Sequence, residues 1–155
     1  EIMPSLVGSE MCIRDRYELV NNPAEAYVIK CLAKVEHVTG ISAVTEDNDP
    51  NGHLGKAGGY TATVYFTCDW VNQANVLGNN IIDKGTDGGG AIEVYANVED
   101  AESRNEYLAG FDGGILASGS HTVVGTCVVR TSDELAASKQ KALEAAVIEA
   151  LTKLE

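Results

Sequence analysis

The feature that most constrains the fold is the alternation, along the chain, of strand-like and helix-like segments separated by glycine-rich breaks. β-Branched and aromatic residues, or strict alternation of apolar and polar residues, indicate strands. Four segments carry this signal strongly: 41–46, 60–68, 91–96 and 122–130. A weaker strand signal covers 115–118. Apolar residues at three- and four-residue steps predict helices over three further segments: 23–36, 98–108 and 131–154.

This order of segments predicts an α+β fold. We expect a two-layer sandwich in which about three helices pack on one face of a mostly antiparallel sheet of four or five strands. A chain of 155 residues with 45% hydrophobic residues is large enough to bury one core. We therefore expect a single α+β domain over residues 17–155. Leu143 and Val147 lie on the apolar seam of the last helix.

The first residues are not expected to belong to this domain. Residues 6–16, with the sequence LVGSEMCIRDR, resemble the translation of a sequencing adapter joined to an open reading frame. We therefore expect residues 1–16 to be a disordered, non-native leader. The chain also begins with Glu1 instead of Met, so the natural N-terminus, with any signal peptide or anchor, is expected to be missing.

The charge of the chain excludes some classes of partner. There are 23 acidic and 11 basic residues, which give a net charge of −12 at pH 7. Nucleic acid is not expected as a partner, because binding a phosphate backbone requires Lys and Arg to replace counterions. The apolar runs are also far shorter than the roughly 20 residues that span a bilayer. A protein or a small molecule is the expected partner.

The cysteines are expected to be small buried side chains. Setting aside Cys12 in the leader leaves Cys31, Cys68 and Cys127, which form no CxxC motif. Their apolar neighbours favour burial. A disulfide between Cys68 and Cys127, across two strands, remains open.

The sharpest local pattern is Asp47-x-Asp49-x-Asn51-Gly52, which resembles the first half of an EF-hand calcium loop. The pattern fails at its closing position, where Gly58 replaces the bidentate glutamate. One interpretation is a turn stabilised by Asp and Asn side chains. The other is a calcium site of another kind, with Asp47, Asp49 and Asn51 as ligands; Ca²⁺ is the one cofactor that this sequence suggests.

No arrangement typical of a catalytic site is evident, so we assign no catalytic residues. The histidines, His37, His53 and His121, lie in none of the common hydrolase motifs. His121 could approach Cys68 or Cys127 across a sheet and form a Cys-His pair. The alternative is a histidine at a strand end with no catalytic role.

Four motifs together resemble an uncharacterised domain of Gram-positive gut bacteria. They are GISAVTEDNDPNG at 40–52, GGYTA at 58–62, KGTDGGG at 84–90 and SGSHTVVG at 118–125. The resemblance spans about residues 30–153 and is to the C-terminal part of proteins some of which carry an N-terminal lipoprotein or membrane segment. It implies an extracytoplasmic domain, secreted or associated with the cell envelope, and it implies no catalytic residues.

These observations lead to three hypotheses of function. The first is a non-enzymatic extracytoplasmic binding or interaction module of unknown ligand, which binds through loops 47–59 and 69–90. The second is a calcium-stabilised extracellular domain that uses the Asp47–Gly52 loop. The third is a Cys-His hydrolase or transferase.

Overall fold

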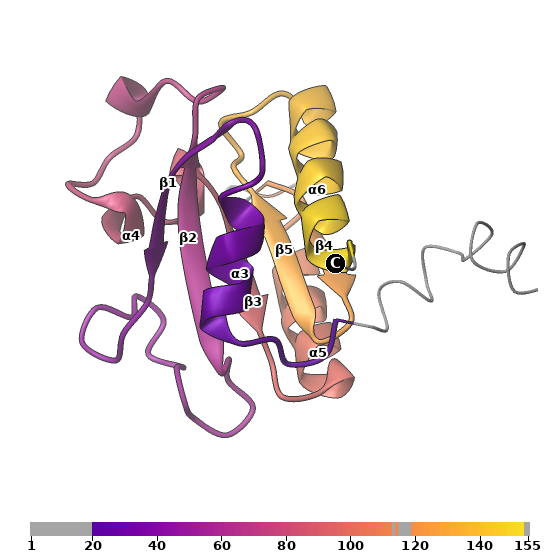
Figure 1. Ribbon diagram of the computed structural model, residues 1–155. Helices are drawn as coiled ribbons and strands as arrows, with labels where there is room; N and C mark the ends of the chain where they lie inside the picture. The colour runs from indigo at the N-terminus through magenta and orange to yellow at the C-terminus, as the bar shows by residue number, and fades with distance from the viewer. Residues whose placement is uncertain (1–19, 113, 115–118, 154–155) are drawn as a thin grey trace, which may run out of the picture.

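Figure 1 shows the computed structural model, which describes residues 20–112, 114 and 119–153. The leader expected over residues 1–16 and the weak strand signal over 115–118 lie outside the described residues.

The strands form one five-stranded sheet in the order β1-β2-β3-β5-β4. Their bounds are β1 (Val38–Ala43), β2 (Ala62–Cys68), β3 (Gly89–Val94), β4 (His121–Val124) and β5 (Cys127–Thr131). Every pair of neighbouring strands is antiparallel. The expected α+β class with an antiparallel sheet is therefore confirmed. At the edge, the register of β1 against β2 shifts between Val38 and Gly40.

Four helices accompany the sheet in the part of the chain that the structure describes. They are α3 (Glu25–Leu32), α4 (Ile81–Lys84), α5 (Val98–Ala109) and α6 (Ala137–Thr152), with two short 3-10 turns, η1 (Gln73–Asn75) and η2 (Gly85–Gly88). The segment 69–90, expected to be irregular, thus contains a helical turn capped by Asn80, whose side chain accepts the N–H of Asp83. Within the described part of the chain, none of the helices has the length and apolar character needed to cross a membrane.

The helices cover both faces of the sheet, which corrects the expected single helical layer. In Figure 1, α3 and α6 lie in front of the sheet and α5 lies behind it. On β5, Val129 packs in the cluster that contains α3 and α6, whereas Val128 packs with Ala101 and Leu108 of α5. Because successive side chains of a strand point to opposite faces, α5 lies on the other face. The face of the sheet that α5 covers carries buried tyrosines, and these provide an apolar surface against which the helix packs.

The larger core lies between the sheet, α3 and α6. Leu143 and Val147 of α6 are 1% and 0% exposed, as expected for the seam of this helix. The Tyr27 hydroxyl of α3 donates a hydrogen bond to the carbonyl of Leu151 in α6, at 2.9 Å. All seven residues of β2 are buried, because helical segments cover the sheet on both sides.

Residues 122–130, expected to form one strand, form a hairpin. Val124 of β4 pairs with Cys127 of β5, so Gly125 and Thr126 make a two-residue turn. Gly125 has φ 60°, in the left-handed region that such turns require and that glycine adopts without steric strain. The β-branched residues on both sides of this glycine hide the turn in the sequence.

Helix α6 starts at Ala137, later than the helix expected over 131–154. The expected start is wrong because the hydroxyl of Ser132 stabilises a separate turn before the helix. Ser132 Oγ accepts the N–H of Glu134 at 2.9 Å and donates to the carbonyl of Asp87 at 2.7 Å. These bonds hold the segment before α6 against η2 instead of opening the helix.

Cys31, Cys68 and Cys127 are buried and form no disulfide. The prediction that they act as small buried side chains is confirmed. All three belong to the core between the sheet, α3 and α6.

Two Leu→Ala substitutions test the position of this core. Leu143→Ala is expected to lower the free energy of unfolding by about 2–5 kcal/mol, because it leaves a cavity among apolar side chains. Leu77→Ala, at a side chain 90% exposed, is expected to change it by less than about 0.5 kcal/mol. Urea unfolding of both variants measures the difference, and equal losses would contradict this description of the core.

Candidate functional site

Asp49 organises the loop between β1 and β2, on which the proposed calcium ligands lie. Its Oδ2 accepts the backbone N–H groups of His53 and Leu54, each at 2.8 Å. Its Oδ1 accepts the N–H of Asn51 at 3.0 Å and the hydroxyl hydrogen of Tyr60. Both carboxylate oxygens therefore hold the loop closed, as the interpretation of the pattern as a turn predicts.

These contacts also determine the ionisation of Asp49 and Tyr60. Burial raises the pKa of Asp49, but the hydrogen bonds from Tyr60 and from three backbone N–H groups lower it more, so the pKa falls below the ordinary 3.8. Burial and the neighbouring carboxylate raise the pKa of Tyr60 well above its usual 10.0. At neutral pH the pair is therefore a carboxylate and a neutral phenol.

The other two proposed calcium ligands are placed differently. Asp47 is exposed on the same loop. The side-chain amide of Asn51 donates to the Tyr60 hydroxyl at 3.2 Å. Among residues 20–112, 114 and 119–153, no group of three or more His, Cys, Asp or Glu side chains is arranged to hold a metal ion. Calcium binding by Asp47, Asp49 and Asn51 stays a prediction.

His121 lies against α5, away from the cysteines. Its Nδ1 is 2.7 Å from Oδ1 of Asn105, and its Nε2 is 3.0 Å from the carboxylate of Asp112. His121 and Val124 point to opposite faces of β4, and Val124 packs in the same core as Cys68 and Cys127. The structure therefore does not bring His121 to either thiol.

The thiols themselves are poor nucleophiles. Burial raises the pKa of Cys68, and it raises the pKa of Cys127 to about 12. A thiolate is the reactive form of cysteine, and burial disfavours it here. The geometry thus gives no support to the Cys-His hypothesis.

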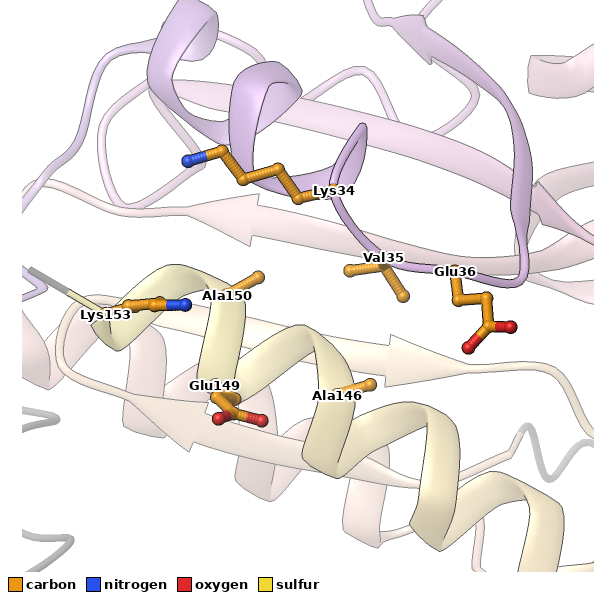
Figure 2. Close-up of a pocket in the computed structure, with 7 residues that line it drawn as sticks. All are labelled: Lys34, Val35, Glu36, Ala146, Glu149, Ala150 and Lys153. Atoms are coloured by element: carbon orange, nitrogen blue, oxygen red, sulfur yellow. The ribbon is translucent and has the colours of Figure 1, made fainter. Parts of the chain in front are cut away.

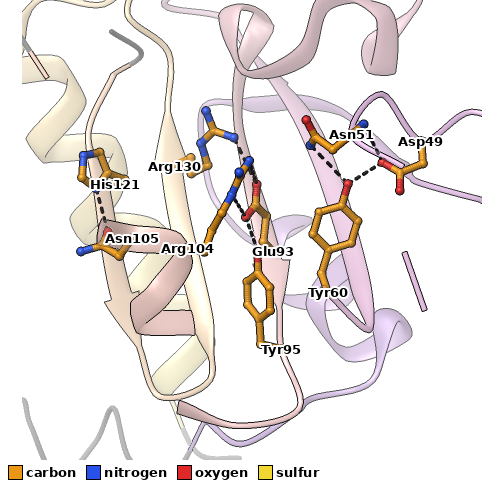
Figure 3. A network of polar contacts seen from close by, with 9 residues as sticks. All are labelled: Asp49, Asn51, Tyr60, Glu93, Tyr95, Arg104, Asn105, His121 and Arg130. Carbon is orange, nitrogen blue, oxygen red and sulfur yellow. Dashed lines mark hydrogen bonds and ion pairs between the residues drawn. The ribbon is translucent and has the colours of Figure 1, made fainter. Parts of the chain in front are cut away.

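Glu93 on β3 is the centre of a buried ionic cluster, shown in Figure 3. Its side chain is 0% exposed. Oε1 accepts the Tyr95 hydroxyl at 2.8 Å and Nε of Arg104 at 2.9 Å. Oε2 accepts Nη2 of Arg104 at 3.3 Å and Nη1 of Arg130 at 3.1 Å. Arg104 therefore binds the carboxylate with two of its nitrogens, from α5, while Arg130 reaches it from β5.

The cluster shifts the pKa of Arg104 and of two neighbouring tyrosines upward. Burial lowers the pKa of Arg104, but the charge of Glu93 and its hydrogen bonds raise it more, so the net shift is upward. Burial, and then the charge of Glu93, raise the pKa of Tyr65 to about 12. The pKa of Tyr95 also rises, through burial and its contact with Glu93. One carboxylate thus faces two guanidinium groups and two neutral phenols.

Sequence reasoning missed Glu93 because the alternation over residues 91–96 places it on a polar face. That face is polar in sequence but covered by α5 in the structure. The available signal was the pairing of one acidic residue in a strand with Arg104 in the following helix and Arg130 in a later strand. Without knowing which face α5 covers, those three residues cannot be connected.

An open groove of about 640 Å³ lies where the Asp49 loop meets α5. One wall comes from the loop and the other from α5, with Tyr95 at the end of β3 between them. Its lining consists of Pro50, Asn51, His53, Gly58, Tyr95, Asp100, Ser103, Arg104 and Tyr107. The α5 residues recur at positions i, i+3, i+4 and i+7, so they form one stripe along the helix. The groove is therefore the candidate site.

A smaller hollow of about 250 Å³ lies between the segment after α3 and the C-terminal half of α6, shown in Figure 2. Val35, Ala146 and Ala150 give it an apolar floor, and charged side chains of both signs surround it. It has no polar cluster comparable to the one at Glu93 among the residues described.

Comparison of the chain with protein-family models, curated proteins and solved structures found no match in any of the three.

The ionic cluster predicts a large effect of removing one charge. Glu93→Gln keeps the shape of the side chain but leaves two guanidinium groups without a carboxylate, so we expect a loss of about 3 kcal/mol in the free energy of unfolding. The control is Glu99→Gln, in the exposed first turn of α5, where the loss is expected to stay within about 1 kcal/mol. Chemical unfolding compares the variants, and similar losses would contradict the role of Glu93.

The lowered pKa of Asp49 predicts how stability depends on pH. The carboxylate stabilises the fold above its unfolded-state pKa, and this contribution is lost as pH falls through its folded-state pKa, below 3.8. Wild type is therefore expected to exceed Asp49→Asn by a constant free energy above about pH 5, with the gap narrowing at lower pH. Tyr60→Phe removes one donor and should weaken this pH dependence. Urea unfolding across the acid range measures it, and a gap independent of pH would contradict the assignment.

Proposed function

We propose that this chain is a non-enzymatic, extracytoplasmic binding module whose ligand occupies the groove between residues 50–58 and α5. The observation that carries the proposal is that two ordered polar clusters, one on Asp49 and one on Glu93, meet at a groove of about 640 Å³. Ligand sites typically enclose about 300–1,000 Å³ and hold a few polar groups in fixed positions.

The walls of the groove are held in place before a ligand arrives. The rings of Tyr60 and Tyr95 meet edge to face, with centroids 6.1 Å apart, and so connect the two clusters. Arg104 is fixed by two hydrogen bonds to Glu93. Side chains that are already ordered lose less conformational entropy on binding, which favours recognition.

Two ionisable groups of the groove, Arg104 and Tyr95, favour binding over turnover. A general acid or base works best when its pKa lies near the working pH. Arg104 is kept charged by Glu93, and the pKa of Tyr95 is raised further from neutrality. Both are therefore better suited to hold a ligand than to exchange a proton with it.

The extracytoplasmic part of the proposal rests on the sequence resemblance. Two motifs of that resemblance, 40–52 and 58–62, also supply residues of one groove wall: Pro50, Asn51 and Gly58. The segments that carry the resemblance, on which the extracytoplasmic location rests, therefore also form part of the proposed binding site.

The groove is tested by NMR on ¹⁵N-labelled protein with a library of water-soluble fragments as the probe. Chemical-shift changes are expected to concentrate at His53, Ser103 and Tyr107. Ser103→Trp places a large side chain in the groove and is expected to abolish them. Ser138→Trp, at an exposed serine in the first turn of α6, is the matched control and should leave them intact. Shift changes that concentrate in the hollow beside Val35, or that persist in Ser103→Trp, would overturn the proposal.

A further inference from the structure

We infer that the groove beside α5 binds an uncharged saccharide, a short chain of neutral sugar units. This inference rests on the proposed function and names the chemical class of its ligand.

The groove offers hydrogen-bonding groups that the protein does not use. Among the residues that the structure describes, the side chains of His53, Asp100 and Ser103 line the groove and have no hydrogen-bonding partner. They combine a carboxylate that only accepts with a hydroxyl and an imidazole that both donate and accept. Sugar hydroxyl groups also donate and accept, so each of these side chains has a complementary group on a saccharide.

Tyr107 supplies an aromatic surface at the same place. It is 60% exposed, which is high for a large aromatic side chain beside a groove. Its ring is nevertheless positioned by two contacts: Arg104 lies 5.5 Å from the ring centroid, and the Phe111 ring meets it edge to face at 5.1 Å. The C–H face of a sugar ring packs against an aromatic ring of this kind, because it is apolar while the ring edges carry the hydroxyls.

The charges of the groove favour a neutral ligand. Glu93 faces both Arg104 and Arg130, which leaves one positive charge in the cluster. Asp100 lines the same groove and supplies one negative charge, so these charges balance at the groove. The chain as a whole carries −12, which further disfavours anionic ligands.

The shape of the groove favours several sugar units over one. The lining residues of α5 run from Asp100 to Tyr107, a length of about 10 Å along the helix axis at about 1.5 Å per residue. Hydrogen-bonding groups lie towards one end of this stripe and the aromatic ring lies at the other. A linear oligosaccharide can contact both ends at once.

The test uses three trisaccharides of similar size as probes: cellotriose, which is neutral, the glucosamine trimer, which is cationic, and trigalacturonate, which is anionic. NMR titrations at physiological ionic strength follow shift changes at His53, Ser103 and Tyr107. Cellotriose is expected to bind with a dissociation constant in the millimolar range, and each charged trimer about tenfold more weakly or not at all.

Substitutions at Tyr107 separate stacking from general effects. Tyr107→Ala is expected to weaken cellotriose binding about tenfold, whereas Tyr107→Phe keeps the ring and should retain the affinity. Leu77→Ala, at an exposed apolar residue elsewhere, is the control and should bind as wild type does.

The outcomes distinguish this inference from the proposed function. If fragments occupy the groove but cellotriose does not, or if a charged trimer binds there more tightly, the saccharide assignment is wrong and the binding groove remains. If Tyr107→Ala binds cellotriose as wild type does, the stacking site is wrong. If neither fragments nor cellotriose occupy the groove, both proposals are wrong.

Discussion

The carboxylate of Glu93 fastens α5 to the sheet, and the arrangement of the polar half of the molecule depends on it. A charge with no exposed surface must be paired, because its transfer out of water is otherwise strongly unfavourable. Arg104 reaches Glu93 from the helix and Arg130 reaches it from the neighbouring strand. Since these bonds are directional, they fix both the rotation of α5 and the position of Tyr95. Because α5 forms the second wall of the groove, the position of that wall depends on these bonds.

The two faces of the sheet contribute in different ways. On the face of α3 and α6, side chains such as Leu143, Val147 and Phe66 supply apolar burial, the main stabilising term in folding. On the face of α5, buried charges and tyrosines replace much of that apolar contact. A buried ionic cluster often stabilises a fold less than well-packed apolar residues would, but its geometry is specific. The apolar core that contributes most of the stability and the polar cluster that shapes the site thus lie largely on opposite faces of the sheet.

Much of the fold could be predicted from local signals in the sequence. The helix expected over 98–108 corresponds to α5 at Val98–Ala109, which starts where the Asn97 side chain accepts the N–H of Asp100. The strand signal over 60–68 corresponds to β2. These predictions succeeded because caps and β-branched runs act through neighbouring residues.

The candidate site could be predicted only in part, because its residues meet through distant contacts. The periodicity of β3 predicts on which face of the sheet Glu93 lies, but it does not say whether a helix covers that face. From the sequence alone, the side-chain oxygens of Asp47, Asp49 and Asn51, at alternate positions, could equally well bind a cation or accept a set of backbone N–H groups. Which of these Asp49 contacts depends on how the loop closes against Tyr60, which no short motif encodes.

The irregular register at the start of β1 bears on how the chain behaves at high concentration. β1 is an edge strand, and the unpaired N–H and C=O groups of such a strand can act as a template for a strand from another molecule. Between Val38 and Gly40, two steps of β1 face one step of β2, and the hydroxyl groups of Thr39 and Thr67 meet at 3.0 Å across this bulge. A bulge bends the strand and breaks the even spacing that an incoming partner needs. The edge nearest α4 is thereby protected against strand addition and the aggregation that follows from it.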